Sequence, residues 1–207
     1  MLPVLIIIAI SVAIAAAAAA TDPLGLLRGA KDSKVVLVGP RKAGKTTWKS
    51  FLTTGHIPEG YAPTQGESFV EAVALADLRM AVHVQDFAGN KETKDSWRKA
   101  AKSADRVYFF VDATRLSDVE YVGRSKEDAK DLSSWQLTCP VDLVATHADL
   151  VEGWPDDPDA VIGIDAVREL SILCSAERTL QANLGSDGGC REFTIEALRP
   201  FMRKEGE

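Results

Sequence analysis

Residues 34–46 read Lys34-Val-Val-Leu-Val-Gly39-Pro-Arg-Lys-Ala-Gly44-Lys45-Thr46, a short apolar run followed by a glycine-rich segment. Lys34–Gly39 is a short run rich in β-branched residues, which predicts a strand buried on both faces. Gly39–Thr46 satisfies the pattern G-x-x-x-x-G-K-[ST], and a helix is predicted over Gly44–Phe51. In the order strand, glycine-rich loop and helix, the backbone N–H groups of the loop wrap a diphosphate at the helix N-terminus. The sequence therefore predicts a phosphate-binding loop.

Two side chains of this loop carry the chemistry of phosphate binding. Lys45 is expected to bridge the β- and γ-phosphates of a nucleotide, and the hydroxyl of Thr46 is expected to ligate Mg²⁺. The full set of residues predicted to hold the phosphates consists of Gly39, Arg41, Lys42, Ala43, Gly44, Lys45, Thr46 and Thr47.

A second motif follows the predicted strand Met80–Gln85. Asp86-Phe-Ala-Gly89 begins at the strand end, where an acidic side chain can hold Mg²⁺ opposite Thr46, directly or through water. Gly89 allows a backbone N–H to approach the γ-phosphate. The pattern D-x-x-G is common by itself, so its position at a strand end carries the prediction.

Two further strand ends are predicted to recognise the base. Thr146-His-Ala-Asp149 follows the predicted strand Val141–Ala145, and the Asp149 carboxylate can accept both the ring N–H and the exocyclic amine of guanine, a pair that adenine lacks. Cys174-Ser-Ala-Glu177 follows a predicted strand over Ile172–Cys174, and the N–H of Ala176 is expected to meet the guanine carbonyl. Ligands of open α/β sheets bind at this carboxyl edge. The predicted base-binding residues are Thr146, His147, Asp149, Ser175 and Ala176.

Strand-like and helix-like segments alternate through the rest of the chain. Strands are also predicted over Ser68–Leu75 and Arg106–Asp112, and helices over Glu92–Ala104, Glu127–Leu137 and Glu192–Met202. This alternation is typical of a parallel sheet covered by helices. The predicted fold class is α/β: a three-layer sandwich with a mostly parallel six-stranded sheet and helices on both faces, preceded by one N-terminal transmembrane helix.

The N-terminal segment has a composition of its own. Leu2–Ala20 is uncharged, and as a helix it would be about 28 Å long, close to the ~30 Å thickness of a membrane's hydrocarbon core. We predict that residues 1–21 form a transmembrane anchor, that residues 22–33 form a linker and that residues 34–207 form a soluble domain. A buried core helix and a cleaved signal peptide are the alternatives, although no basic residue precedes the run. The basic residues downstream favour a cytosolic soluble domain.

The composition excludes several classes of protein. Of the 207 residues, 46% are hydrophobic and 26% are charged, so a core can form and wholesale disorder is excluded. The formal net charge of -6 argues against broad nucleic-acid binding, which normally shows a basic surplus. The three cysteines, Cys139, Cys174 and Cys190, have no C-x-x-C spacing. Reduced thiols are therefore expected, rather than a disulfide scaffold or a zinc site.

Across roughly residues 34–204, these motifs resemble the small Ras-like GTPases, and most of all their Arf and Sar branch. The likeness runs through Ala62-Pro-Thr-Gln-Gly66, Val82-His-Val-Gln-Asp-Phe-Ala-Gly89, Trp97-Arg98 and Val107-Tyr-Phe-Phe-Val-Asp-Ala113. The resemblance implies a P-loop NTPase fold, GTP or GDP and Mg²⁺ as ligands, and hydrolysis of GTP to GDP and phosphate. It also implies two switches that the γ-phosphate orders, the second beginning at Asp86. The metal ligands that it implies are Thr46, Thr64 and Asp86.

An Arf-like domain behind an N-terminal anchor resembles the family of signal recognition particle receptor β subunits. That likeness implies a place in the endoplasmic reticulum membrane and an α-type receptor subunit as the protein partner. Another anchored Arf-like switch with a different effector, including a prokaryotic one, remains the alternative.

Four residues depart from the family pattern. Asn90 stands where an active member usually has the glutamine that orients the attacking water, so slow hydrolysis is expected. Arg41 is expected beside the γ-phosphate, where it either stabilises charge in the transition state or crowds the water. Thr146 and His147 replace the asparagine and lysine of N-K-x-D, which predicts a lower affinity for guanine. The residues expected to act in hydrolysis are Lys45, Thr64, Gly89 and Asn90.

The sequence therefore favours a membrane-tethered, GTP-dependent switch whose hydrolysis is slow or depends on a partner. One alternative is a docking platform that holds its nucleotide without hydrolysing it. A P-loop ATPase or a small-molecule kinase is the other alternative, and Asp149 argues against it.

Overall fold

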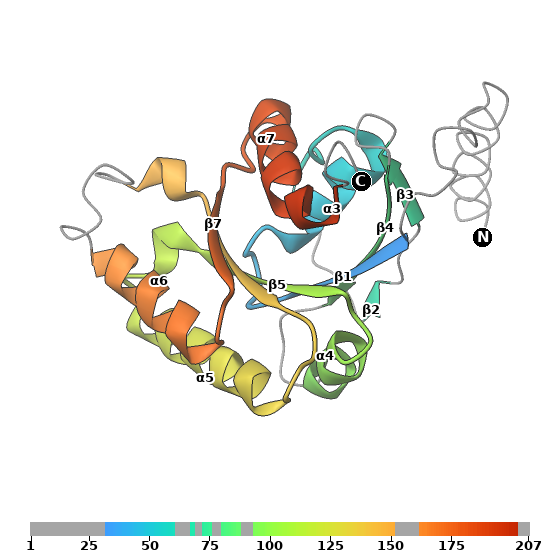
Figure 1. Cartoon of the computed structure of the whole chain (residues 1–207). Helices are drawn as coiled ribbons and strands as arrows, with labels where there is room; N and C mark the ends of the chain where they lie inside the picture. Colours follow the sequence, from blue (N-terminus) through green and yellow to red (C-terminus); the bar gives the residue numbers. More distant parts are fainter. Residues whose placement is uncertain are drawn as a thin grey trace, which may run out of the picture.

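The fold is built on five parallel strands whose carboxyl ends share one edge of a sheet. In the computed structural model, the described residues are 32–60, 67–68, 72–75, 80–87, 93–151 and 162–202. The parallel strands follow the order β4-β1-β5-β6-β7 across the sheet (Figure 1). Their bounds are Asp32–Val38 for β1, Met80–Phe87 for β4, Arg106–Asp112 for β5, Val141–Thr146 for β6 and Arg178–Ala182 for β7.

Two short strands lie beside β4 and run against it. β2 (Glu67–Ser68) pairs with Asp86–Phe87, and β3 (Ala72–Leu75) pairs with Met80–His83. The predicted count of six strands is therefore wrong for the described residues, because five strands are parallel and two short ones are antiparallel. The run Ser68–Leu75 predicted one strand, and its described residues belong to β2 at Ser68 and to β3 at Ala72–Leu75.

Helices cover both faces of the sheet, as predicted. One face carries α3 (Lys45–Thr54) and α7 (Asp187–Leu198) (Figure 1). The other face carries α4 (Lys94–Ala101), α5 (Val119–Ser134) and α6 (Ile162–Leu173). Three short 3-10 helices follow β5, β6 and α7: η3 (Ala113–Arg115), η4 (Ala148–Leu150) and η5 (Arg199–Phe201).

Two helices begin earlier than the sequence predicted because a polar side chain caps each start. The carboxylate of Asp118 accepts hydrogen bonds from the N–H groups of Glu120 and Tyr121 at the start of α5. The hydroxyl of Ser186 accepts one from the N–H of Gly189 at the start of α7. Such caps satisfy N–H groups that have no partner inside the helix.

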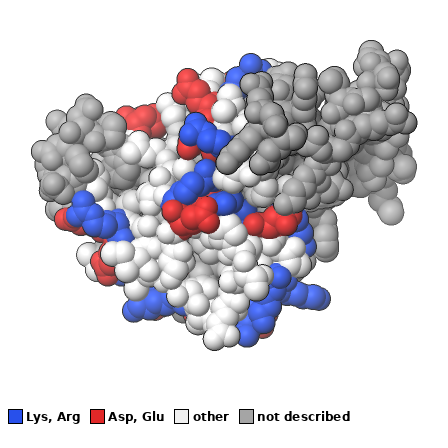
Figure 2. Space-filling view, in the orientation of Figure 1, with Lys and Arg blue, Asp and Glu red and all other residues white. Residues whose placement is uncertain are grey.

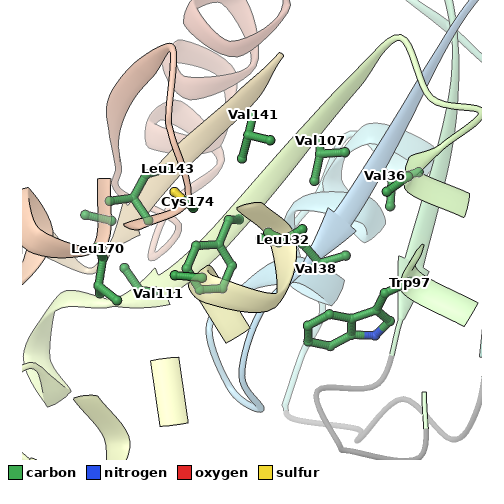
Figure 3. Packing of buried hydrophobic residues seen from close by; sticks show 14 of the residues in the cluster. Val36, Val38, Trp97, Val107, Val111, Leu132, Val141, Leu143, Leu170 and Cys174 are labelled. Carbon is green, nitrogen blue, oxygen red and sulfur yellow. The ribbon is translucent and has the colours of Figure 1, made fainter. Parts of the chain in front are cut away.

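The strand that leads into the phosphate-binding loop is buried on both faces, as predicted. Val35–Val38 are fully buried, and their side chains alternate between two hydrophobic clusters. Val36 and Val38 belong to the cluster under α4, α5 and α6, which Figure 3 shows. On the other face, Trp48 of α3 packs against Phe193 of α7 with the ring centroids 4.9 Å apart.

The prediction of a strand over Ile172–Cys174 is wrong. Ile172 and Leu173 end α6, and Cys174 directly follows it; Val167, Leu170 and Cys174 are buried against the sheet at helical spacing. The strand β7 begins later, at Arg178.

A buried ion network joins the amino ends of β5, β6 and β7. Asp142 is fully buried and accepts hydrogen bonds from Arg106, at 2.7 Å, and from Nε of Arg178, at 3.1 Å. Arg106 also donates to Glu177 at 3.0 Å. This network lies at the edge of the sheet opposite to the phosphate-binding loop.

The predicted anchor over residues 1–21 lies outside the described residues, as does the linker except for its last two positions, which belong to β1. In the ranges that the structure describes, no helix combines the length and the apolar character needed to cross a membrane.

Candidate functional site

The loop between β1 and α3 depends on two glycines. Gly39 has a φ of 131° and Gly44 a φ of 83°, both in the region that favours glycine. A Cβ atom at Gly39 would lie 2.2 Å from the backbone oxygen of Phe110 in β5. A Cβ atom at Gly44 would lie 2.6 Å from Cδ1 of Leu184. The loop therefore lies between β5 and the segment after β7. Glycine is favoured at position 39 by the backbone contact and the positive φ, and at position 44 mainly by the positive φ.

The other predicted phosphate-binding residues differ in exposure. Ala43 is buried and Thr47 is half-buried at the start of α3. Arg41 and Lys42 are exposed at the tip of the loop, and Lys42 has a φ of 64°. The two cationic side chains thus face solvent beside the loop backbone.

Lys45 is buried within the curve of this loop. Its ammonium group donates hydrogen bonds to the backbone oxygens of Gly39 and Pro40, each at 2.8 Å. Burial lowers the pKa of Lys45 to about 8, and the negative charge of Asp86 opposes that effect. The loop thus encloses a cationic donor, as a phosphate-binding loop requires.

Thr46 and Asp86 meet where the first turn of α3 approaches the end of β4. The Thr46 hydroxyl donates a hydrogen bond of 2.8 Å to Oδ2 of Asp86, whose side chain is buried. Hydroxyl and carboxylate oxygens are the donors that Mg²⁺ prefers, and it commonly takes its other ligands from phosphates and waters. These two residues therefore fit a magnesium ion. The described residues hold no group of three or more His, Cys, Asp and Glu side chains that could bind a metal by themselves.

The predicted base-binding segment at the end of β6 adjoins the phosphate-binding loop. Thr146 is buried and donates to the backbone oxygen of Val111 at 3.1 Å. Its methyl carbon would lie 3.2 Å from a Cβ atom at Gly44. Asp149 lies three residues further on, in η4, and is exposed. Its carboxylate is thus open to a base that extends from the loop.

His147, which follows β6, contacts the ends of the two strands that flank it, β5 and β7. It has a φ of 56°, and its N–H donates to the backbone oxygen of Ala182 at 3.0 Å. Nδ1 of the ring lies 3.5 Å from Oδ1 of Asp112 at the end of β5. The interaction with Asp112 raises the pKa of His147 against the opposing effect of burial. Burial acts to raise the pKa of Asp112, but the interactions with His147 and Thr114 outweigh it and hold that pKa low.

Ser175 and Ala176 are not at this site, contrary to the sequence prediction. They follow α6 and precede β7, and the N–H of Ala176 donates to the backbone oxygen of Ser171 at 2.8 Å. The next N–H, that of Glu177, bonds to Val141 at the start of β6. Both residues therefore lie at the amino edge of the sheet, away from Asp149, because the segment they follow is a helix.

The segment 183–186, which the sequence motifs did not predict as part of the site, follows β7 and reaches it. Leu184 is 3% exposed and lies against Gly44. The signal that marks this segment is the pair Gly185-Ser186 before a helix, because serine caps helix starts. Three further predicted residues, Thr64, Gly89 and Asn90, lie outside the described residues.

Acidic and basic side chains are mixed on the face that Figure 2 shows, rather than gathered into one continuous basic patch. This pattern agrees with the net negative charge. It gives no support on that face for broad binding of nucleic acid, which needs a basic surface.

Comparisons with known proteins point in one direction. The profile of the ADP-ribosylation factor family matches residues 21–147. The chain is 24% identical over 157 residues to the Ras-like GTP-binding protein RHO1 of Entamoeba histolytica, a match that spans 76% of this chain and 72% of the relative. It is 26% identical over 105 residues to ADP-ribosylation factor-like protein 8d of Arabidopsis thaliana, covering 51% and 56%. It is 24% identical over 182 residues to the Rho-related protein racE of Dictyostelium discoideum, covering 86% and 81%.

Proposed function

The chain belongs to the ADP-ribosylation factor family of small GTPases, and from this premise we propose that it is a switch which hydrolyses GTP slowly unless a partner protein assists. The family accounts for guanine-nucleotide binding and for the general capacity to hydrolyse GTP. The proposal rests on one observation. Lys45, Thr46 and Asp86 lie together at the carboxyl edge of the sheet, and Asp149 lies on the same edge.

Each of these residues has a defined task. Lys45 supplies a buried positive charge for the phosphates, and Gly39 and Gly44 let the loop backbone approach them. Thr46 and Asp86 would hold Mg²⁺, which neutralises phosphate charge when bound. Asp149 would accept the two N–H groups that only guanine presents. Together these residues would bind the phosphates, the magnesium ion and the base of GTP.

The slow rate is proposed from the residue types at two positions. Asn90 is one methylene shorter than glutamine, so it orients an attacking water less well. Arg41 is exposed at the tip of the phosphate-binding loop, where its charge either stabilises the transition state or crowds the water. A partner that orders the water or neutralises charge would then restore the rate.

Attachment to a membrane is a further part of the proposal. The uncharged run Leu2–Ala20 is long enough to cross a bilayer as a helix. An anchored Arf-family domain with weak hydrolysis suits a receptor subunit that recruits a partner to the membrane. We therefore keep the β subunit of the signal recognition particle receptor, at the endoplasmic reticulum and with an α-type subunit as partner, as the narrower hypothesis. A different anchored Arf-like GTPase is the alternative.

A docking platform without hydrolysis is the second candidate function. It is favoured by Asn90, Arg41 and His147, three residues that depart from the pattern of active family members. A platform would hold nucleotide and release no phosphate.

Multiple-turnover release of phosphate separates the switch from the platform. The full-length chain is incubated with Mg²⁺ and excess GTP, beside the variant Lys45→Met as a control. Slow release that the variant abolishes supports the switch. Release no greater than that of the variant, with GTP still bound to the wild-type chain, supports the platform instead.

Anchoring is tested separately by flotation with liposomes. The full-length chain is compared with one that lacks residues 1–21. If only the full-length chain floats with the lipid, the anchor is supported; if neither does, the anchor is wrong.

A further inference from the structure

The ring of His147 lies beside the carboxylate of Asp112, and Asp149 follows two residues further along the chain. His147 directly precedes η4, the short helix that carries Asp149. Its N–H is bonded to Ala182 of the neighbouring strand β7, so its backbone position is fixed by the sheet. A change in the charge of this ring therefore acts directly on the segment that presents Asp149.

The carboxylate opposite the ring is held in place. Oδ1 of Asp112 accepts hydrogen bonds from the backbone N–H and the hydroxyl of Thr114, at 3.0 and 2.7 Å. The backbone N–H of Asp112 donates to the hydroxyl of Tyr121, at 2.7 Å. With 11% of its side chain exposed, Asp112 is a fixed, partly buried negative charge, and 31% of the His147 side chain is exposed.

The charged groups that act on the ring come from two elements. Asp112 faces it from the end of β5, and Asp149 acts on it from η4. Both are acidic, so a protonated imidazole offsets the repulsion between them, whereas a neutral one does not. Arg115 of η3 is directed elsewhere, because its guanidinium lies over the Tyr121 ring at 4.2 Å.

We propose that His147 is a positioning residue for guanine recognition, which pairs with Asp112 when protonated and thereby makes nucleotide retention stronger at lower pH. This inference rests on the proposed function, because it concerns the same nucleotide site. A lysine at this position would be positively charged at every physiological pH, whereas His147 is positively charged only when its ring is protonated.

The direction of the pH dependence follows from the charge states. Because Asp112 raises the pKa of His147 above the ordinary value of 6.5, the pair is fully formed below that pH in the folded protein. Its contribution is lost as the pH rises through the raised pKa. Asp112 keeps its negative charge throughout this range, since its pKa is lowered below the ordinary value of 3.8.

The experiment measures the dissociation constant of a fluorescently labelled GDP between about pH 6 and pH 8 in saturating Mg²⁺. The full-length wild-type chain is compared with His147→Lys and His147→Gln. His56→Gln is the matched control, because His56 is 79% exposed and pairs with Asp187 at the start of α7. Ionisation of the phosphates and of Lys45 acts alike on all four proteins, so ratios between them isolate His147.

For the wild type and His56→Gln, we expect binding to weaken by a factor of about 3 to 5 between the lower and the higher pH, relative to His147→Lys. His147→Gln should bind the labelled GDP more weakly than His147→Lys at both the lower and the higher pH. If the wild-type and His147→Lys profiles run parallel, the inference is overturned while the proposed function stands. If the wild type binds no guanine nucleotide at any pH, both are overturned.

A second measurement follows the ring itself. Titration of the His147 ring proton by NMR should give a pKa above 6.5 in the wild type and a lower one in Asp112→Asn. Equal values in the two proteins would overturn the pairing, whatever the binding data show.

Discussion

The hydroxyl of Thr46 donates a hydrogen bond of 2.8 Å to the carboxylate of Asp86, although the two residues are 40 positions apart in the sequence. The bond joins the first turn of α3 to the end of β4, so the two oxygens proposed to hold Mg²⁺ are already adjacent. Because each oxygen is positioned by a different element, losing either should weaken the metal site without unfolding the sheet.

The variant Asp86→Asn should lose most of the effect of magnesium on nucleotide retention. An amide oxygen carries no net charge, so affinity for Mg²⁺ should fall about 10- to 100-fold. The measurement is the rate of GDP release with and without a chelator. The wild type should release GDP faster when Mg²⁺ is removed, and the variant should barely respond. Asp165→Asn, on the exposed surface of α6, serves as the control and should behave as the wild type. If chelation accelerates GDP release from Asp86→Asn as much as from the wild type, Asp86 does not hold the metal.

Gly39→Ala should be among the most damaging small substitutions in the chain. Its Cβ would lie 2.2 Å from the backbone oxygen of Phe110, at a φ of 131°. We expect a loss of more than about 2 kcal/mol in the free energy of unfolding, measured with urea. Gly123→Ala in α5 is the matched control, because its Cβ would meet nothing within 4 Å. That variant should gain about 0.5 to 1 kcal/mol from helix propensity. Equal effects of the two changes would contradict the close approach of β5 to the loop.

Asp142→Ala should destabilise the fold strongly and leave the site chemistry intact. The variant leaves the buried guanidinium of Arg106 and the partly exposed one of Arg178 without their shared carboxylate, which costs about 3 to 5 kcal/mol. Glu120→Ala breaks the exposed pair with Arg124 and should cost at most about 1 kcal/mol. Thermal unfolding of the two variants checks the contrast. Similar losses in both would show that the buried network contributes little.

Leu184→Ala tests the segment after β7 that the sequence reasoning missed. Leu184 is buried against Gly44, so its truncation should cost about 2 to 4 kcal/mol and accelerate GDP release. Ser175→Asn at the opposite edge is the comparison, because asparagine tolerates the φ of 53° found there. It should release GDP at the wild-type rate. Faster release from Ser175→Asn than from Leu184→Ala would place residues 175–176 at the base site instead.

Much of the fold could be predicted because its signals are local. The run Val35–Val38 between a charged residue and Gly39 marks a strand buried on both faces, and the motif that follows fixes the loop and the start of α3. The apolar run before Asp149 predicts the end of β6 in the same way. In each case the functional residues directly follow a buried strand, so their order in the sequence is enough to place them at the carboxyl edge of the sheet.

The end of the sheet could not be predicted with the same rules. Ile172–Cys174 is apolar and short, and a run of that length fits a strand or the last turn of a helix equally well. The true strand, β7, begins with Arg178, whose charge is satisfied by Asp142 of the neighbouring strand. That partner is known only from the fold. The wrong strand placed the predicted base site at the wrong edge, while the actual segment, 183–186, is marked only by Gly185-Ser186 before a helix.

Base selection by Asp149 is the central claim, and one measurement tests it most directly. The full-length chain is incubated with Mg²⁺ and equal amounts of GTP and ATP, separated from free nucleotide, and its bound nucleotide is identified by chromatography. We expect guanine nucleotide alone on the wild type and a large loss of it in Asp149→Ala; because Asp149 is exposed, unfolding would not explain that loss. Adenine nucleotide on the wild type, or no nucleotide at all, would contradict the account.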